Sequence, residues 1–115
     1  MILGSCACGK VSYEADRLDG PVVHCHCRTC RKVHASAFAT TARVHRHHFR
    51  WLQGHTLIRK FESSPGKRRH FCCACGTHLI AEWSHLAFVI LRMGAVDTDP
   101  VEMPSTHIWY AHSPH

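Results

Sequence analysis

The chain has 115 residues, enough for one domain with a modest hydrophobic core and too few for two. A hydrophobic fraction of 45% and a charged fraction of 19% indicate an ordinary globular domain and exclude a disordered chain. The longest apolar run, residues 86–91, is far shorter than the roughly 20 residues of a membrane-spanning helix, which excludes a membrane protein. The formal net charge of +6 would suit a nucleic-acid partner, but cysteine thiolates bound to metal would lower that charge.

Turns containing glycine or proline divide the chain into short segments, most of which have the alternation or the β-branched and aromatic residues of strands. In chain order we predict strands at residues 11–15, 57–61, 79–83, 86–93 and 106–110, and one short helix over residues 29–37. The segment 86–93 is expected to be buried on both faces. The basic run 43–50 is predicted to be a solvated loop or an edge strand rather than an anion-binding patch. The predicted fold class is therefore mainly β, a single small domain of short antiparallel strands over residues 1–115.

The eight cysteines fall into three clusters, which are Cys6 with Cys8, then Cys25, Cys27 and Cys30, then Cys72, Cys73 and Cys75. C-x-C and C-x-x-C spacings allow two thiolates to bind one metal ion, because the turn between them brings both Cβ atoms to one side. Gly9 and Gly76 follow the outer clusters, and glycine adopts the positive φ that such turns often need. The cysteines therefore indicate metal binding.

The number of sulfurs in each cluster separates two kinds of metal site. The two outer pairs together supply four sulfurs, enough to close a tetrahedral structural zinc, while the middle cluster supplies three and leaves an open position, as catalytic zinc requires. We therefore predict two zinc ions per chain, one structural and one catalytic. The predicted ligands are Cys6, Cys8, Cys72 and Cys75 for the first and Cys25, Cys27 and Cys30 for the second. Cys73 is left over and is expected to point away from the metal.

The residues alone leave three alternatives open. Disulfides are possible, although a C-x-C bridge is strained and the first residues lack a secretory signal. A single four-cysteine zinc would leave the middle cluster redox-active, or closed by His24 or His26. Iron is an alternative metal, although a four-plus-three division of ligands favours zinc. Cysteine use and the missing signal together lead us to expect a cytoplasmic protein.

Several short motifs occur together and in order, from residue 4 to about residue 110. They are Gly4-Ser-Cys-x-Cys-Gly9, Cys25-His-Cys-x-x-Cys-Arg-Lys32, Ser63-Ser-Pro-Gly66, Arg69-x-Phe-Cys-x-x-Cys-Gly-Thr77 and His107-Ile-Trp109. This set resembles the glutathione-dependent formaldehyde-activating enzyme family, which includes centromere protein V-like proteins. The resemblance implies a β-tent-like fold built on zinc, with the division of ligands that sulfur counting gives. One departure is Ala35, which stands where we expect glycine.

The resemblance also implies an activity, that of a carbon–sulfur lyase joining glutathione and formaldehyde to give S-hydroxymethylglutathione. We expect the partner to be a small-molecule thiol such as glutathione, bound at the open position of a catalytic site formed by Cys25, Cys27 and Cys30. We expect neither a membrane nor a nucleic acid as partner. The competing hypothesis is a non-enzymatic zinc-binding module that presents a surface to a protein or nucleic acid. A pure scaffold would have no need of a three-cysteine cluster, which favours the enzyme.

Basic side chains near the cysteines are candidates for substrate binding and proton transfer. Arg31, Lys32 and Arg69 could hold the carboxylates of glutathione through charge-assisted hydrogen bonds, with a solvated surface position as the alternative for Arg69. The candidate proton carriers are His24, His26 and His70. His107, on an aromatic predicted strand, is as well explained by a structural role.

Overall fold

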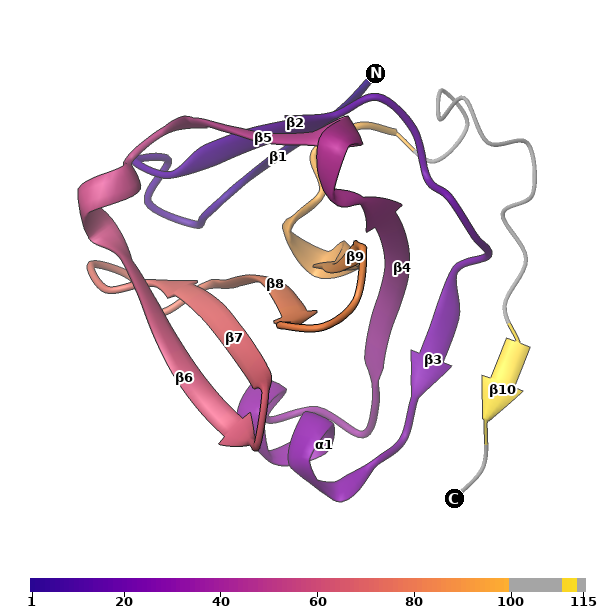
Figure 1. Cartoon of the computed structure of the whole chain (residues 1–115). Coiled ribbons are helices and arrows are strands. Elements are labelled where there is room, and N and C mark those ends of the chain that lie inside the picture. Colours follow the sequence, from indigo (N-terminus) through magenta and orange to yellow (C-terminus); the bar gives the residue numbers. More distant parts are fainter. Residues whose placement is uncertain (100–110, 114–115) are drawn as a thin grey trace.

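The computed structural model describes residues 1–99 and 111–113, whose strands form two sheets (Figure 1). The smaller sheet is antiparallel and has, in spatial order, β1 (Ile2–Ser5), β2 (Ser12–Ala15) and β5 (Phe49–Gln53). The larger has, in spatial order, β10 (Ala111–Ser113), β3 (Val23–Cys25), β4 (Ala39–His45), β9 (Phe88–Arg92), β8 (His78–Trp83), β7 (Lys67–Cys72) and β6 (Ile58–Ser64). Helix α1 spans Arg28–His34, and 3-10 turns occupy Arg46–His48, His55–Leu57 and Met93–Ala95. No helix in this described part has the length and apolar character needed to cross a membrane.

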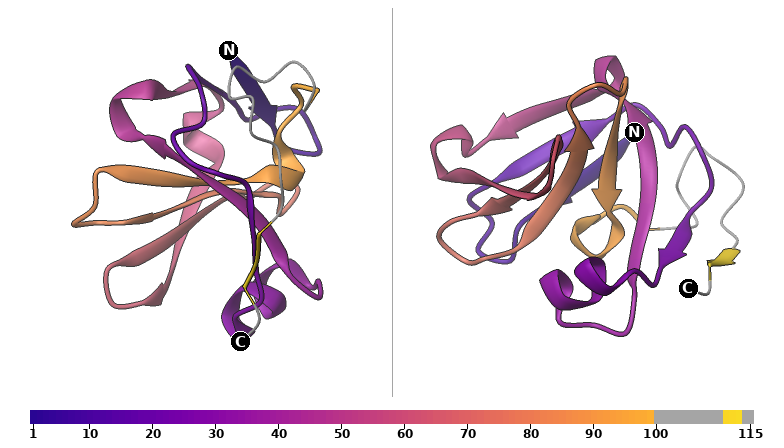
Figure 2. Two further views of the ribbon diagram at one scale, coloured as in Figure 1. Left: turned by 90° about the vertical axis from the view of Figure 1, so that its right-hand side faces the viewer. Right: turned by 60° about the horizontal axis from the view of Figure 1, so that its bottom comes forward.

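The two sheets pack around one apolar core. The smaller sheet lies across one end of the curved larger sheet, and α1 lies at the other end (Figures 1 and 2). Fully buried core side chains come from both sheets and include Ile2, Val11, Tyr13, Val44, Leu79, Val89 and Leu91. The prediction of a mainly β fold with short antiparallel strands is confirmed. One pairing differs, because β10 runs parallel to β3.

Most of the predicted elements are present. Strands β2, β6, β8 and β9 and helix α1 lie within a few residues of the predicted segments. The strand predicted at 106–110 lies outside the described residues. Four short or charged strands, β1, β3, β7 and β10, lie outside every predicted segment. Strands β4 and β5 overlap only the basic run 43–50, for which a loop or an edge strand was predicted.

Two detailed predictions are wrong. The basic run 43–50 was predicted to be a loop or an edge strand. Its first residues belong to β4, which is an interior strand between β3 and β9, so the prediction is wrong there. Its last residues belong to β5, which is an edge strand as predicted. The charge of Arg43 is tolerated because its Nε donates to the backbone oxygen of Asp19 at 3.0 Å and its guanidinium lies 5.0 Å from the ring of Phe88. Strand β9 is not buried on both faces, since Val89 is buried whereas its neighbour Phe88 is partly exposed.

Strand β7 connects the two regions that contain the cysteine clusters. It begins at the β6–β7 turn, close to α1, and ends at Cys72, beside the turn between β1 and β2 (Figure 1). Arg69 and Cys72 are three residues apart on this strand, which places them about 10 Å from each other. One strand therefore contributes a side chain to each candidate site.

Candidate metal centres

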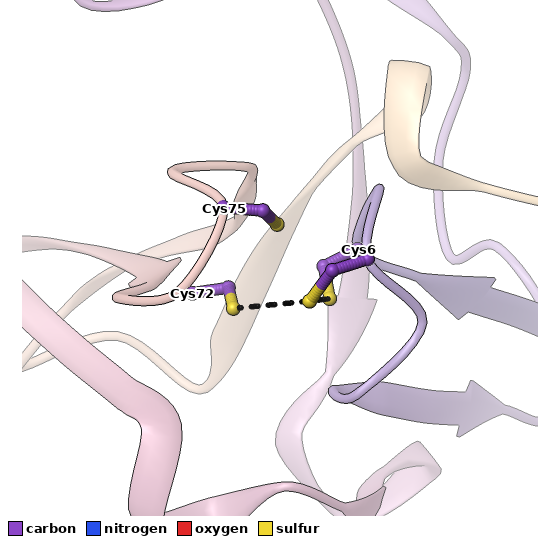
Figure 3. A group of neighbouring side chains, drawn as sticks. Cys6, Cys72 and Cys75 are labelled. Atoms are coloured by element: carbon purple, nitrogen blue, oxygen red, sulfur yellow. Dashed lines mark hydrogen bonds between the residues drawn. The ribbon is translucent and has the colours of Figure 1, made fainter.

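Four cysteine sulfurs from two turns far apart in the sequence meet near the smaller sheet. They belong to Cys6 and Cys8 in the β1–β2 turn and to Cys72 and Cys75 in the β7–β8 turn, and all lie within 4.8 Å of one another. Figure 3 shows the side chains of Cys6, Cys72 and Cys75 converging. The sulfurs of Cys6 and Cys8 are 3.5 Å apart and those of Cys8 and Cys72 3.9 Å apart. A zinc ion with Zn–S bonds of about 2.3 Å needs sulfurs about 3.8 Å apart, so this donor set fits zinc.

The two turns of this four-cysteine group have similar backbones. The amide of Cys6 donates to the oxygen of Val11, and the amide of Cys72 donates to the oxygen of Thr77, both at 3.0 Å. Gly9 and Gly76 have φ values of 77° and 80°, which confirms the predicted need for glycine. These turns direct each pair of sulfurs to one point.

Three more sulfurs gather where β3 meets α1. Cys25 ends β3, Cys27 is the N-cap residue of α1, and Cys30 is buried in its first turn. Their sulfurs also lie within 4.8 Å of one another, with 3.5 Å between those of Cys25 and Cys30. The amide of Cys30 donates to the sulfur of Cys27 at 3.3 Å, which fixes the turn. Sulfur is the donor that zinc prefers, so three such ligands fit zinc as well.

Within residues 1–99 no histidine, cysteine, aspartate or glutamate adds a fourth ligand atom to this three-cysteine group. The rings of His24 and His26 instead lie against Phe38, with centroids 4.4 Å and 5.3 Å from its ring, and His24 Nδ1 is 3.1 Å from the hydroxyl of Thr40. All eight cysteines are free thiols, so the disulfide alternative is not observed. Cys73 is exposed and belongs to neither group.

Arg69 places a buried guanidinium against the three-cysteine group. Its Nη2 lies 3.6 Å from the sulfur of Cys30, and its Nε donates to the hydroxyl of Ser63 at 2.8 Å. The side chain is 1% exposed, so the solvated alternative is wrong. Burial raises the pKa of Cys30, but hydrogen bonds with Cys27 and Arg69 outweigh it and lower the pKa to about 7. Arg69 therefore favours the thiolate that a metal would bind.

The other candidates lie in different surroundings. Arg31 and Lys32 are exposed on α1 and line an open hollow of about 650 Å³. His70 is buried, with Nε2 3.6 Å from Glu82, and faces away from the three cysteines, because neighbours on a strand point to opposite faces and Arg69 faces Cys30. Its expected role as proton carrier at this site is wrong. His107 lies outside the described residues.

Sequence analysis missed a second buried arginine near the three-cysteine group. Arg92 ends β9, is 5% exposed, and lines a cavity of about 370 Å³ with His34 and His78. Burial and the charge of Arg69 lower the pKa of Arg92 to about 10, and the thiolates of the three-cysteine group oppose that lowering. The sequence contained a signal for it, because Arg92 directly follows the apolar run 86–91 inside a segment predicted to be buried. A cation buried in this way needs a partner.

Comparison with known proteins gives one family and one fold. The family model described as glutathione-dependent formaldehyde-activating enzyme matches residues 1–112. A search among curated proteins gives no match. Among solved structures, the crystal structure of a Rhodobacter sphaeroides protein is similar, with a TM-score of 0.73 and 19% identity, covering 95% of this chain and 99% of that chain. This likeness shows the shared fold. Because the family model spans nearly the whole chain, the chain belongs to the glutathione-dependent formaldehyde-activating enzyme family.

Proposed function

We propose that this protein is a zinc-dependent carbon–sulfur lyase that joins a thiol such as glutathione to formaldehyde, giving S-hydroxymethylglutathione. The observation that carries the proposal is the contrast between the two sulfur groups. One offers four ligands and closes a structural site, and the other offers three among the described residues, which suits a site that accepts a substrate. Family membership supports the same reaction class.

We assign the structural zinc to Cys6, Cys8, Cys72 and Cys75 and the catalytic zinc to Cys25, Cys27 and Cys30. When bound, the catalytic zinc supplies an open coordination position and lowers the pKa of a thiol held there. The thiol first loses its proton, so its S–H bond breaks. Its sulfur then forms one S–C bond while the C=O π electron pair moves to the formaldehyde oxygen, which takes up a proton in place of the one that the thiol lost. The residues of the chain must therefore orient a thiol, stabilise a developing oxyanion and deliver a proton.

Arg69 is suited to the oxyanion. Two of its nitrogens already bind Ser63 and Cys30, whereas Nη1 has no hydrogen-bond partner among the described residues. A buried, fixed donor beside the sulfurs costs little reorganisation when negative charge develops. Arg31 and Lys32, exposed on the same helix as Cys30, are suited to the carboxylates of a glutathione molecule that enters from solvent.

His24 and His26 flank Cys25 and are the proposed proton carriers. His26 is the better placed of the two, because it lies between two of the cysteines and is partly exposed. His24 is buried, and its Nδ1 is occupied by the hydroxyl of Thr40. The eight free thiols support a reducing compartment, and we place the protein in the cytoplasm.

Zinc content and turnover of matched serine variants test the proposal. We expect two zinc ions per chain in the wild type. Cys27→Ser should keep its fold, lose one zinc and lose formaldehyde consumption in the presence of glutathione. Cys73→Ser is the matched control, since Cys73 is exposed and outside both groups, and it should keep both zinc ions and full turnover. Full turnover by Cys27→Ser, or one zinc in the wild type, would refute the proposal.

Glutathione binding separates an enzyme from a zinc module that only presents a surface. Calorimetry on the zinc-loaded wild type should show one glutathione site, and Cys27→Ser should weaken it. A wild type that holds two zinc ions and binds no thiol would instead support the module.

A further inference from the structure

The cavity beside the three-cysteine group contains a buried arginine with unpaired donors. It lies between the end of α1, the start of β4, the start of β8 and the end of β9, and its volume is about 370 Å³. Arg92 is 5% exposed, and its Nε and Nη2 have no hydrogen-bond partner among the described residues. Burying guanidinium N–H groups without acceptors destabilises a fold, because each group loses its hydrogen bonds to water and gains none in return. Such a cost suggests that the cavity receives an acceptor.

Two histidines add donors to the same cavity. His34 and His78 both line it, with ring centroids 5.2 Å apart. His34 Nε2 and His78 Nδ1 are buried and have no hydrogen-bond partner in the part of the chain that the structure describes. Burial, together with the charge of Arg92, lowers the pKa of His34 to about 4 and also lowers that of His78. Both rings are therefore neutral at pH 7, and each has one N–H to donate and one nitrogen to accept.

Among the described residues that line the cavity, Arg92 is cationic and none is a carboxylate. None of the ion pairs among the described residues includes Arg69 or Arg92. Burial and the charge of Arg69 lower the pKa of Arg92 to about 10, so it stays cationic at neutral pH. Three thiolates on one divalent zinc would carry a net charge of −1, which cannot balance two buried arginines.

We propose that this cavity is a binding site for one small oxyanion group, a carboxylate or a phosphate, held by Arg92 with His34 and His78 as neutral donors. Its volume is within the range of small-molecule sites, about 300–1,000 Å³. The oxyanion site itself rests on the cavity alone, and only the assignment of its ligand to the substrate rests on the proposed function. The oxyanion has two possible sources, a carboxylate of the substrate bound at the neighbouring cysteines or a free oxyanion such as phosphate.

Nuclear magnetic resonance titrations of the zinc-loaded full chain test the site. Acetate, inorganic phosphate and glutathione are added separately, while the Arg92 Nε–H signal and the ring signals of His34 and His78 are followed. At least one ligand should shift these signals saturably. Arg92→Gln should weaken binding at least about tenfold, the loss expected for a charge-assisted hydrogen bond. Arg59→Gln is the matched control, since it removes an equal charge from the exposed strand β6 and should leave binding unchanged.

The three ligands distinguish the two sources. If glutathione shifts the Arg92 signals and competes with acetate, the oxyanion is the substrate's carboxylate. If phosphate or acetate binds and glutathione neither shifts the signals nor competes, the cavity takes a free oxyanion. If none of the three gives a saturable shift in the wild type, the proposal is wrong, and this test stands even if Arg92→Gln does not fold. Zinc content and turnover of the same sample report separately on the proposed function.

Discussion

The two sulfur groups use the same ligand in opposite ways. The four-cysteine group joins two turns that are far apart in the sequence, since Cys8 and Cys72 are separated by 64 residues. A hydrogen bond also joins the turns directly, because the amide of Ala7 donates to the hydroxyl of Thr77 at 3.0 Å. The three-cysteine group draws its ligands from residues 25–30, so it closes almost no loop. The first group therefore restrains the whole chain, whereas the second restrains only one turn.

The surroundings of the two sulfur groups also differ, in how completely their polar groups are hydrogen-bonded. Around the four-cysteine group the backbone amides are paired and the turns contain glycine at positive φ. Around the three-cysteine group lie two buried arginines, unpaired donors and a cavity. Natural folds keep such unfavourable features mainly where function requires them. The comparison assigns stability to one region and chemistry to the other.

The strongest test of this comparison is Cys72→Ser. Cys72 is fully buried, and its loss would remove one of the four ligands of the proposed structural zinc, whose binding free energy would contribute directly to folding. We expect an unfolded or insoluble protein, seen by circular dichroism and by the soluble yield. Cys73→Ser changes the adjacent, exposed cysteine and should fold like the wild type. A Cys72→Ser protein with wild-type thermal stability would show that the four-cysteine group is not what holds the fold.

Gradual removal of metal gives the next largest effect. A chelator should take the zinc of the three-cysteine group first, because three ligands hold it less completely than four. Turnover should then fall while the near-ultraviolet circular dichroism of the aromatic side chains is unchanged. Loss of the second zinc should coincide with unfolding. Zinc release followed with a colorimetric dye, alongside the dichroism, checks the order. Simultaneous loss of both ions with the fold would contradict the division of roles.

The sequence was most informative where structure depends on local spacing. Both cysteine groups could be predicted, because ligand counting needs no knowledge of topology. Strand β4 could not, because its Arg43 is exposed and contacts the backbone oxygen of Asp19 and the ring of Phe88, both distant in sequence. The cavity around Arg92 depends on four separate elements, so no local motif marks it.

The pH dependence of stability sharpens the comparison at the cavity. Burial, and then the charge of Arg92, lowers the pKa of His34 from its ordinary 6.5 to about 4. Between these two values the unfolded chain binds a proton at His34 more readily than the folded chain does. The contribution of His34 therefore lowers the free energy of unfolding as the pH falls from 6.5 towards 4, and it does not change above about 6.5. In His34→Gln this loss is absent. From pH 7 to pH 5, the free energy of unfolding of the wild type should therefore fall relative to that of the variant. Denaturant titrations of both proteins at the two pH values measure this difference. An unchanged difference would mean that His34 titrates normally.

The smallest predicted effect concerns Ala35, the one residue other than glycine that has a positive φ among the described residues. Ala35 ends α1 with φ 49° and ψ 45°, whereas Gly9 and Gly76 provide the positive φ in the four-cysteine turns. An alanine in this conformation costs about 1 kcal/mol relative to glycine, so Ala35→Gly should raise the free energy of unfolding by about that amount and the melting temperature by a few degrees. Ala37→Gly is the matched control, because Ala37 is also exposed but has no positive φ, and there the added freedom of the unfolded chain should lower stability. Equal effects of the two substitutions would show that the end of α1 is unstrained. Opposite effects would place the strain of the fold beside the three cysteines, where the chemistry is proposed, and not in the turns that hold the chain together.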